Sequence, residues 1–310
     1  MDSPDITVEA RSLTKSYGRT RARGIVNVDV SVGAGEVLGL VGANGAGKTT
    51  LMRTMLDFIR PTSGTLRLLG MDSVSDAVQI RRRVTYLPGE LVFPARLTGH
   101  QVVSRYLAAR AEVTGSRVGE LASQLDVDLS RPVGDLSRGN KQKIGLLLAF
   151  APRADLLVLD EPTSGLDPLL QREFASMVRQ VAAGGSSVLL SSHVMSEVEE
   201  VAHRVALMRE GRLVAVETMS EVIAKGRRRG RARPRDSGSA PTLAENLRRT
   251  EGVDDVEVAD GGHDEGLVTF AVTGDVNALL ATLSAHPLAS FDLAHADLED
   301  AFFGAYEDPR

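Results

Sequence analysis

The strongest constraint on the fold of this chain is a glycine-rich segment near its N-terminus that fits the pattern G-x-x-x-x-G-K-[ST] at every position. An apolar run precedes the segment and a helix-like run follows it. A strand, a loop and a helix N-terminus in this order direct several backbone N–H groups at one point and favour negative charge there, which predicts a phosphate site rather than a chance turn. The lysine of the pattern reaches β- and γ-phosphates, and the next hydroxyl can bind Mg²⁺. The residues predicted to bind a nucleotide are Gly42, Ala43, Asn44, Gly45, Ala46, Gly47, Lys48, Thr49 and Thr50.

Composition describes an ordinary globular protein and removes several classes of function. The 310 residues are 43% hydrophobic and 25% charged, and the formal net charge of −5 gives no overall attraction to nucleic acid or anionic lipid. The absence of cysteine excludes disulfides and thiolate metal sites. We expect no signal peptide in the acidic segment Met1–Asp5, and the longest apolar runs, such as Ile144–Ala151, are too short to span a bilayer. A role at a membrane would therefore require a partner.

Apolar periodicity predicts an α/β fold around the glycine-rich segment. Ile6–Ala10 and Ile25–Val32 alternate as half-buried strands do. Leu156–Asp160 is instead a continuous aliphatic run that ends in an acid, which is typical of a buried parallel strand. Ser187–Ser191 predicts a second buried strand. The segment at about residues 90–145 has helical spacing without a strong strand signal, so we expect a helical insertion between two parts of the sheet.

Charged side chains follow both predicted buried strands. Asp160 and Glu161 close the first strand, and His193 comes just after the second. Because ligands of α/β sheets bind at the carboxyl ends of the strands, we expect these three residues at the same sheet edge. Taken alone, the two acids are equally compatible with an ordinary strand end.

Two further signals are weak on their own. Tyr17 lies beside the turn residue Gly18 and could stack on an adenine ring, although a lone tyrosine at a strand end more often packs against its neighbours. Ser137 precedes Gly139 and a long apolar helix, so it predicts a second helix N-terminus with anion-binding potential.

The composition shifts after the first two thirds of the chain. We predict one domain over residues 1–223, a basic flexible linker over 224–241 and a small α+β accessory domain over 242–310. The arginine-rich linker could contact nucleic acid, lipid head groups or a partner, but without interleaved aromatic residues a solvated hinge is the favoured interpretation. The accessory domain carries no catalytic cluster. Its predicted last helix covers Leu298–Tyr306.

The order of these segments resembles the nucleotide-binding subunit of ATP-binding-cassette (ABC) transporters. The resemblance covers about residues 5–220, and its most specific part is the hydrophobic strand that ends in Asp-Glu-Pro. It implies a P-loop ATPase fold, with a mixed sheet, a RecA-like core and a helical subdomain. The segments that carry the resemblance are Tyr17, the loop at 42–49, Leu136-Ser137-x-Gly139, Asp160-Glu161, Ser164-Gly165-Leu166-Asp167 and His193.

This resemblance implies ATP and Mg²⁺ as ligands and assigns a task to each site residue. Tyr17 would stack on adenine while the loop and Lys48 hold the phosphates. Thr49 and Asp160 would hold Mg²⁺. Glu161 would polarise the attacking water as general base, and His193 would contact the γ-phosphate. These residue types suit phosphoryl transfer, which needs mainly positioning and neutralisation of charge.

The resemblance also implies a head-to-tail dimer. Each ATP would lie between the phosphate loop of one subunit and the signature segment of the other, while Asp167 would lie near the dimer seam. ATP binding would close the dimer and hydrolysis would open it, driving a membrane partner. The signature residues of this chain are Ser137, Arg138, Gly139 and Asn140.

The chain departs from the family pattern in two places. The signature reads Leu-Ser-Arg-Gly-Asn in place of Leu-Ser-Gly-Gly-Gln. Arg138 is compatible with the function of the signature if its side chain points away from the phosphate contact. The family usually carries a glutamine after Tyr86-Leu87-Pro88, where this chain has Gly89 and Glu90. That glutamine contacts Mg²⁺ and communicates with the membrane subunit, so either Glu90 or water would take its place.

The C-terminal segment Asp297–Phe303 resembles the close of ATPases that serve two-component drug or antibiotic exporters. That likeness implies a separately encoded integral membrane permease, no nucleic-acid partner, and a peripheral location on the cytoplasmic face of the cell membrane. Two alternatives stay open. One is a soluble ABC ATPase acting on ribosomes or DNA, which the single cassette and the lack of heptads disfavour. The other is the ATPase of an importer or a lipoprotein-release system.

Overall fold

The computed structural model describes residues 6–18, 22–110, 112–259, 265–274 and 276–294. The chain divides into two compact units, residues 1–216 and residues 217–310. No helix within these described ranges is both long enough and apolar enough to cross a membrane.

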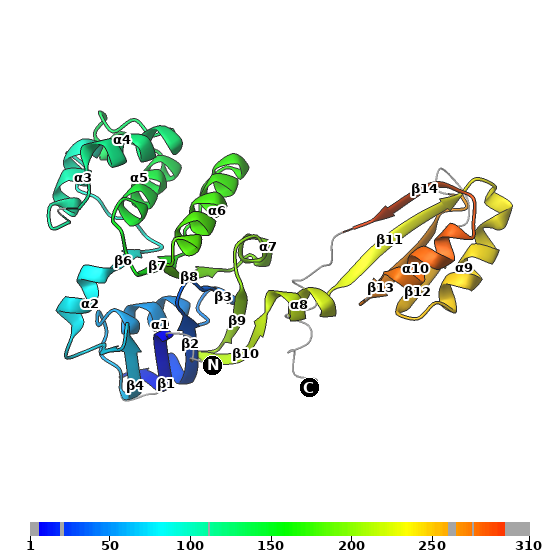
Figure 1. Ribbon diagram of the computed structural model, residues 1–310, viewed down its shortest axis with the longest axis horizontal. Coiled ribbons are helices and arrows are strands. Elements are labelled where there is room, and N and C mark those ends of the chain that lie inside the picture. The colour runs from blue at the N-terminus through cyan, green and yellow to red at the C-terminus, as the bar shows by residue number, and fades with distance from the viewer. Residues whose placement is uncertain (1–5, 19–21, 111, 260–264, 275, 295–310) are drawn as a thin grey trace. The chain divides into compact units, whose positions relative to one another are not determined.

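The first unit is built on a six-stranded sheet whose central strands are parallel (Figure 1). Its aliphatic runs form strands that are buried at every position, as the sequence predicted. The segments Val205–Met208 and Arg212–Val216 lie in two neighbouring strands at one edge of this sheet. In spatial order the strands are β10 (Arg212–Thr218), β9 (Arg204–Arg209), β3 (Val37–Val41), β8 (Ser187–Ser192), β7 (Leu156–Asp160) and β6 (Val84–Leu87).

A second, antiparallel sheet completes the core of this unit. Its alternating strands place Val8, Leu13 and Ile25 in one hydrophobic cluster with residues of the parallel sheet and of α1. The strands are β2 (Ala22–Gly33), β1 (Ile6–Tyr17), β4 (Ser63–Leu68) and β5 (Met71–Asp72) in spatial order. The helices that flank the two sheets are α1 (Lys48–Met55), α2 (Ala77–Arg83), α6 (Pro168–Ala183) and α7 (Met195–Glu199).

The predicted insertion between the strands is helical. Figure 1 shows its helices grouped on the side of β6 and β7 away from β1, β2 and β4. Thr98 closes a capping box with Gln101 at the first helix, and Ser137 caps the last one through the N–H of Asn140. The elements are α3 (Gly99–Leu107), α4 (Gly115–Gln124), a 3₁₀ turn at Val133–Asp135 and α5 (Arg138–Phe150).

The second unit has a four-stranded sheet with α9 and α10 packed against one face (Figure 1). Two of its strands cover Val253–Val258 and Leu288–Leu293. The elements are α8 (Met219–Lys225), β11 (Arg227–Pro234), a 3₁₀ turn at Ser237–Ser239, α9 (Ala240–Arg248), β12 (Val253–Val258), β13 (Val268–Thr273), α10 (Asn277–Ser284) and β14 (Leu288–Leu293), and the sheet order is β12-β13-β11-β14.

The prediction of a flexible linker over 224–241 is wrong, because most of that segment is ordered as β11, the 3₁₀ turn and the start of α9. Strand β11 lies inside the sheet and pairs with both β13 and β14. Its Gly230 and Ala232 are buried while Arg229 and Arg231 are exposed. The sequence did not reveal this alternation of buried and exposed residues, because the buried positions carry very small side chains.

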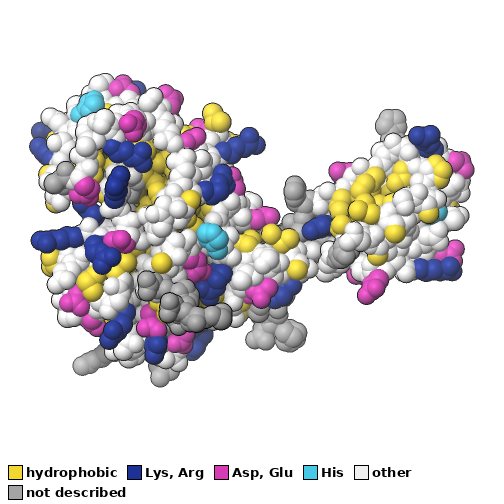
Figure 2. All heavy atoms as spheres, viewed as in Figure 1, with side chains coloured by type: hydrophobic (Ala, Val, Ile, Leu, Met, Phe, Trp, Pro, Cys, Tyr) yellow, Lys and Arg dark blue, Asp and Glu magenta, His cyan; other side chains and the backbone are white. Residues whose placement is uncertain are grey.

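Charged side chains of both signs are interspersed on the visible surface of each unit, and hydrophobic ones gather on part of the second unit (Figure 2). Among the described residues of that unit, Ile223, Leu280 and Phe291 are large, hydrophobic and exposed. The predicted helix Leu298–Tyr306 and the segment Asp297–Phe303 lie outside the described residues.

Candidate functional site

The glycine-rich loop connects the buried strand β3 to the first turn of α1. Gly47 caps the helix in the left-handed region with φ of 109°, where a side chain would be strained. At Gly42 an added Cβ would lie 2.3 Å from the carbonyl oxygen of Met208 on β9, so only glycine fits there. The loop backbone is thus held open in front of the helix N-terminus, whose first N–H groups have no partner inside the helix.

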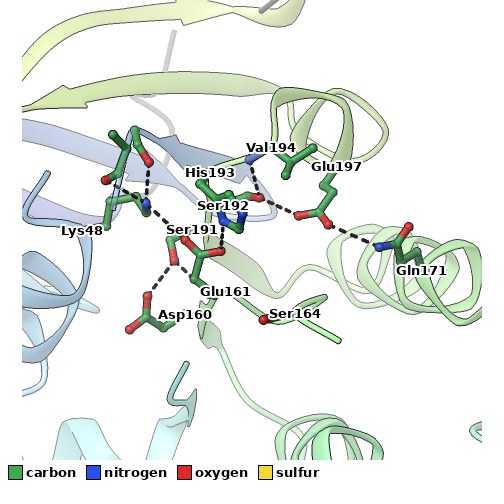
Figure 3. A network of polar contacts seen from close by, with 12 residues as sticks. Lys48, Asp160, Glu161, Ser164, Gln171, Ser191, Ser192, His193, Val194 and Glu197 are labelled. Atoms are coloured by element: carbon green, nitrogen blue, oxygen red, sulfur yellow. Dashed lines mark hydrogen bonds and ion pairs between the residues drawn. The ribbon is translucent and has the colours of Figure 1, made fainter. Parts of the chain in front are cut away.

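The ammonium of Lys48 connects this loop to the end of β7 (Figure 3). The side chain is 5% exposed, and Nζ donates to the carbonyl oxygen of Gly42 at 2.5 Å and to that of Ala43 at 3.4 Å. Its third contact is an ion pair of 3.2 Å with Oε1 of Glu161. A buried cation with these partners is fixed in place, and phosphate oxygens would compete with the carboxylate for it.

Asp160 and Glu161 lie side by side at the carboxyl end of β7, and one serine of β8 holds them both. The hydroxyl of Ser191 donates to Oδ1 of Asp160 at 2.7 Å and accepts the N–H of Glu161 at 3.0 Å. Asp160 is 2% exposed, whereas Glu161 has a left-handed backbone with φ of 48° that turns its side chain to a different direction. Sequence reasoning missed Ser191, although its place on the strand that leads to His193 was a usable signal.

His193 completes a chain of contacts with Glu161 and Lys48. Its Nδ1 lies 2.7 Å from Oε2 of Glu161, so the carboxylate contacts the imidazole with one oxygen and Lys48 with the other. The loop that carries His193 is held by Ser192, whose hydroxyl accepts the N–H of Val194 at 3.0 Å and donates to Glu197 at 2.5 Å (Figure 3).

These residues open into one pocket with a volume of about 370 Å³. The structure therefore brings Asn44, Thr49, Asp160, Glu161 and His193 together from distant segments of the chain. The pocket is lined by Asn44, Thr49, Arg53, Gly89, Glu90, Arg138, Asp160, Glu161, Ser164 and His193.

Other predicted residues do not line this pocket. Tyr17 ends β1 with 37% of its surface exposed, and the ammonium of Lys15 lies 5.4 Å from its ring centroid. Ser137 caps α5, and Asp167 caps α6 by accepting the N–H groups of Leu169 and Leu170. All three are thus accounted for by packing or capping within one copy of the chain.

The side chain of Arg138 lies close to the residues of the pocket. Its Nη2 donates to the hydroxyl of Ser164 at 2.7 Å. The sequence left its direction open, and within this chain it points to the loop that follows Glu161. Glu90 lines the same pocket, and Gly89 lies so close that an added Cβ would be 3.3 Å from the carbonyl oxygen of Asp160.

A tyrosine adjacent to the site stays neutral. Burial raises the pKa of the Tyr86 phenol, and the charge of Asp160 raises it further, while contact with Arg53 acts in the opposite direction. Tyr86 therefore adds no negative charge beside the acids at neutral pH.

The arrangement fits a divalent cation shared with a phosphate. Thr49 and Asp160 supply oxygen atoms to the same pocket, and oxygen is the ligand that Mg²⁺ prefers. Over the described ranges no three His, Cys, Asp or Glu side chains form a cluster suited to a metal ion. Mg²⁺ is commonly held by one or two protein oxygens together with phosphates and water, and these two residues suit that mode.

Comparison with known proteins gives similarity to one family. A family model described as "ABC transporter" matches residues 25–164. The bacitracin transport ATP-binding protein BcrA of Enterococcus faecalis is 33% identical over 227 residues, covering 72% of this chain and 73% of that protein. The daunorubicin/doxorubicin resistance ATP-binding protein DrrA of Streptomyces peucetius is 32% identical over 231 residues, covering 71% and 67%. The methionine import ATP-binding protein MetN 2 of Shouchella clausii is 31% identical over 229 residues, covering 70% and 67%.

Solved structures have the same fold. An ATP-binding subunit of an ABC transporter superposes with a TM-score of 0.64 and 26% identity, over 70% of this chain and 91% of that one. A dimeric ATP-binding cassette in a post-hydrolysis state, bound to ADP and Pi, superposes with a TM-score of 0.62 and 19% identity, over 68% and 98%.

Proposed function

The chain belongs to the ABC transporter family of ATP-binding, ATP-hydrolysing subunits, and we propose that it powers export of a drug- or antibiotic-like substrate through a separate membrane-spanning subunit. The observation that carries the catalytic part is the position of Glu161, which contacts Lys48 and His193 beside Asp160. The export part is supported by relatives named for bacitracin transport and daunorubicin/doxorubicin resistance.

In this proposal the loop from Gly42 to Thr50 binds the phosphates of ATP. The N–H groups at the start of α1 and the ammonium of Lys48 supply the positive side of the contact. Tyr17 offers an exposed ring on which the adenine base stacks.

Thr49 and Asp160 would hold Mg²⁺ in this scheme. Ser191 fixes one oxygen of Asp160, which orients the carboxylate before any ligand binds. When bound, the ion would neutralise negative charge on the phosphates.

Glu161 acts as the general base that orients the attacking water. Because phosphate oxygens compete for Lys48, nucleotide binding weakens the ion pair of 3.2 Å and leaves Oε1 of Glu161 to accept a proton from water. The His193 imidazole keeps the other carboxylate oxygen in position, and His193 also lies where a γ-phosphate contact is expected.

Besides the membrane-spanning subunit, this proposal includes a second copy of the chain as a partner. Ser137, Gly139 and Asn140 lie outside the lining of the chain's own pocket, which leaves them available to the ATP of a partner. They would contact that ATP across a head-to-tail interface, with Arg138 beside them in the same segment and Asp167 at the seam. The likeness to a dimeric cassette supports this arrangement at the level of the fold.

We infer that the membrane-spanning subunit contacts an apolar pocket of the first unit. A pocket of about 210 Å³ lies between β6 and the helical insertion, and it is lined largely by apolar side chains that include Leu91, Phe93 and Leu107. Val92 is 79% exposed and Tyr106 is 55% exposed at its rim. Large exposed apolar side chains that gather at a pocket mark interaction sites. We place the permease here, with the ATPase peripheral to the cytoplasmic face of the membrane.

The proposal is tested by isolating the full chain from detergent-solubilised membranes through an affinity tag. We expect an integral membrane protein to accompany it and to be lost when Val92 and Tyr106 are both changed to Glu. Isolation of the chain without any integral membrane protein would contradict the transport role.

A second candidate is import, favoured by the 31% identity to a methionine import ATP-binding protein. The direction is decided in proteoliposomes that hold the isolated complex with its ATP sites outward. An exporter moves substrate into the vesicle lumen when ATP is added outside, whereas an importer releases substrate from the lumen.

A further inference from the structure

The signature helix α5 is fastened to the loop at residues 161–167 within the same chain. Arg138 in its first turn and Gln142 in its second turn are four residues apart and therefore lie on one helix face. Both side chains donate hydrogen bonds to that loop. The loop begins with the proposed base Glu161 and ends with Asp167 at the proposed dimer seam.

The contact of Arg138 reaches the backbone of Glu161 in two steps. Nη2 of Arg138 donates to the hydroxyl of Ser164 at 2.7 Å, and the N–H of Ser164 donates to the carbonyl oxygen of Glu161 at 3.2 Å. The stem of Arg138 also covers Gly165, since its Cδ lies 3.7 Å from where a Cβ of that glycine would be. A displacement of Arg138 is therefore transmitted to the turn that carries Glu161.

Gln142 makes the second contact deeper in the protein. Its side chain is 5% exposed, and Nε2 donates to the carbonyl oxygen of Pro162 at 2.7 Å. Pro162 directly follows Glu161, so this bond fixes the residue next to the proposed base. A buried hydrogen bond of this kind is costly to lose, because the carbonyl group would be left without a partner.

The backbones of the two segments also approach closely. A Cβ added at Gly139 would lie 3.0 Å from the carbonyl oxygen of Gly165. No side chain separates the start of α5 from the loop at this point. The segment that contacts the partner's ATP therefore lies directly on the loop of the chain's own site.

We propose that Arg138 and Gln142 are positioning residues that couple engagement of the signature segment by a partner's ATP to the orientation of Glu161 in the same chain. The proposal rests on the proposed roles of Glu161 and of the signature segment. A shift of α5 on contact with the partner's nucleotide moves Ser164 and Pro162, and the turn between them carries the carboxylate. Hydrolysis in one site thus depends on occupation of the other through a contact inside each subunit.

The arginine is a property of this chain, because the common signature has glycine at its position. The guanidinium of Arg138 donates a hydrogen bond of 2.7 Å to Ser164, and this links the signature segment to the loop in a way that glycine cannot. An alternative role for Arg138 is direct contact with a phosphate, since it also lines the pocket. The two roles differ in whether Ser164 is required.

A double-mutant cycle on the full chain separates these roles. The variants are Arg138→Met, which keeps the stem and removes the donor, Ser164→Ala, which removes the acceptor, and the double variant. For coupling through Ser164 we expect each single variant to lower kcat by roughly two- to tenfold with the Kd for ATP unchanged, and the double variant to be no slower than the slower single one. The steepness with which the hydrolysis rate rises with ATP concentration, which measures cooperativity between the two sites, should fall in all three variants.

The cycle has two results that overturn the proposal. Ser164→Ala with the kcat and steepness of the unmodified chain excludes the route through Ser164. Single effects that multiply in the double variant show that Arg138 and Ser164 act independently. The matched control is Arg153→Met, an exposed arginine just beyond the end of α5, which should leave kcat and Kd unchanged.

Gln142→Met gives an independent reading of the second contact. It conserves side-chain volume and removes only the donor to Pro162. We expect lower kcat, unchanged Kd for ATP and lower steepness, and an unchanged kcat in folded protein overturns the role of Gln142. Failure of the family assignment itself would give a different result, namely an unmodified chain that neither binds nor hydrolyses ATP.

Discussion

At Glu161 four constraints meet on one residue. The backbone is left-handed with φ of 48°, the N–H is held by Ser191, and the two carboxylate oxygens contact Lys48 and His193. A non-glycine residue in this conformation costs of order 1–3 kcal/mol, which the surrounding contacts must offset. At Glu161 the left-handed conformation occurs at a residue whose direction matters for the proposed chemistry.

Glu161→Gln should bind ATP as the unmodified chain does and hydrolyse it roughly 10²- to 10⁴-fold more slowly, because the amide cannot take a proton from water. Fluorescence titration with a labelled ATP analogue and release of inorganic phosphate measure the two quantities. A hydrolysis rate close to that of the unmodified chain would remove Glu161 from the role of base.

Ser191→Ala should weaken both the fold and the metal site. The change leaves Oδ1 of Asp160 and the N–H of Glu161 without their shared partner, and we expect a loss of about 1–3 kcal/mol in the free energy of unfolding. Urea denaturation measures the stability, and Mn²⁺ titration in the presence of ADP measures metal affinity. Ser220→Ala, at an exposed position of α8, is the control. Unchanged stability and metal affinity in Ser191→Ala would show that the serine does not hold the site.

Elements at the site differ in how far the sequence predicted them. Strand β7 has the predicted bounds. A run of aliphatic residues that ends in an acid is typical of a buried parallel strand in an α/β protein, so the sequence alone indicated it. The glycine loop was predicted for a similar reason, since its spacing is local. The bond from Arg138 to Ser164 spans 26 positions, and that from Gln142 to Pro162 spans 20. No local pattern indicates such pairs.

Asp167 caps α6, and two substitutions can separate this structural role from its proposed role at the dimer seam. Asp167→Asn keeps an N-cap of comparable strength, whereas Asp167→Ala should lower the free energy of unfolding by about 1 kcal/mol. If Asp167 also acts at the dimer seam, Asp167→Asn should reduce hydrolysis with little change in thermal stability. Full activity in a stable Asp167→Asn variant would limit this residue to capping.

Strand β11 shows how composition can obscure an element. Its arginines suggested a solvated linker, but Gly230 packs under the ring of Phe270, where an added Cβ would lie 2.2 Å from a ring carbon. The inward side chains are small because the helices and the aromatic ring fill the space.

Gly230→Val should therefore destabilise the second unit by about 1–3 kcal/mol or more through overpacking, while the first unit keeps its affinity for ATP. Limited proteolysis and ATP titration measure the two units separately. Arg231→Val, at an exposed position of the same strand, is the matched control and should leave proteolysis unchanged. Loss of ATP binding in Gly230→Val would show that the two units do not fold independently.

On the scale of the whole molecule, the proposed reaction requires two copies of the chain. The chain's own pocket contains the phosphate loop and the acids, while Ser137 and Asn140 do not line it. Sequence order predicted both halves, because the family pattern has them along one chain. The assembly itself involves contacts between copies, which no pattern within one chain describes.

The association state of Glu161→Gln tests this requirement most directly. Sedimentation velocity on the full-length variant with Mg²⁺ compares ATP with ADP at the same protein concentration. We predict a dimer with ATP and a monomer with ADP, because ATP that is not hydrolysed keeps the signature segment of each copy on the other's nucleotide. A variant that binds ATP and sediments as a monomer in both nucleotides would contradict the shared site.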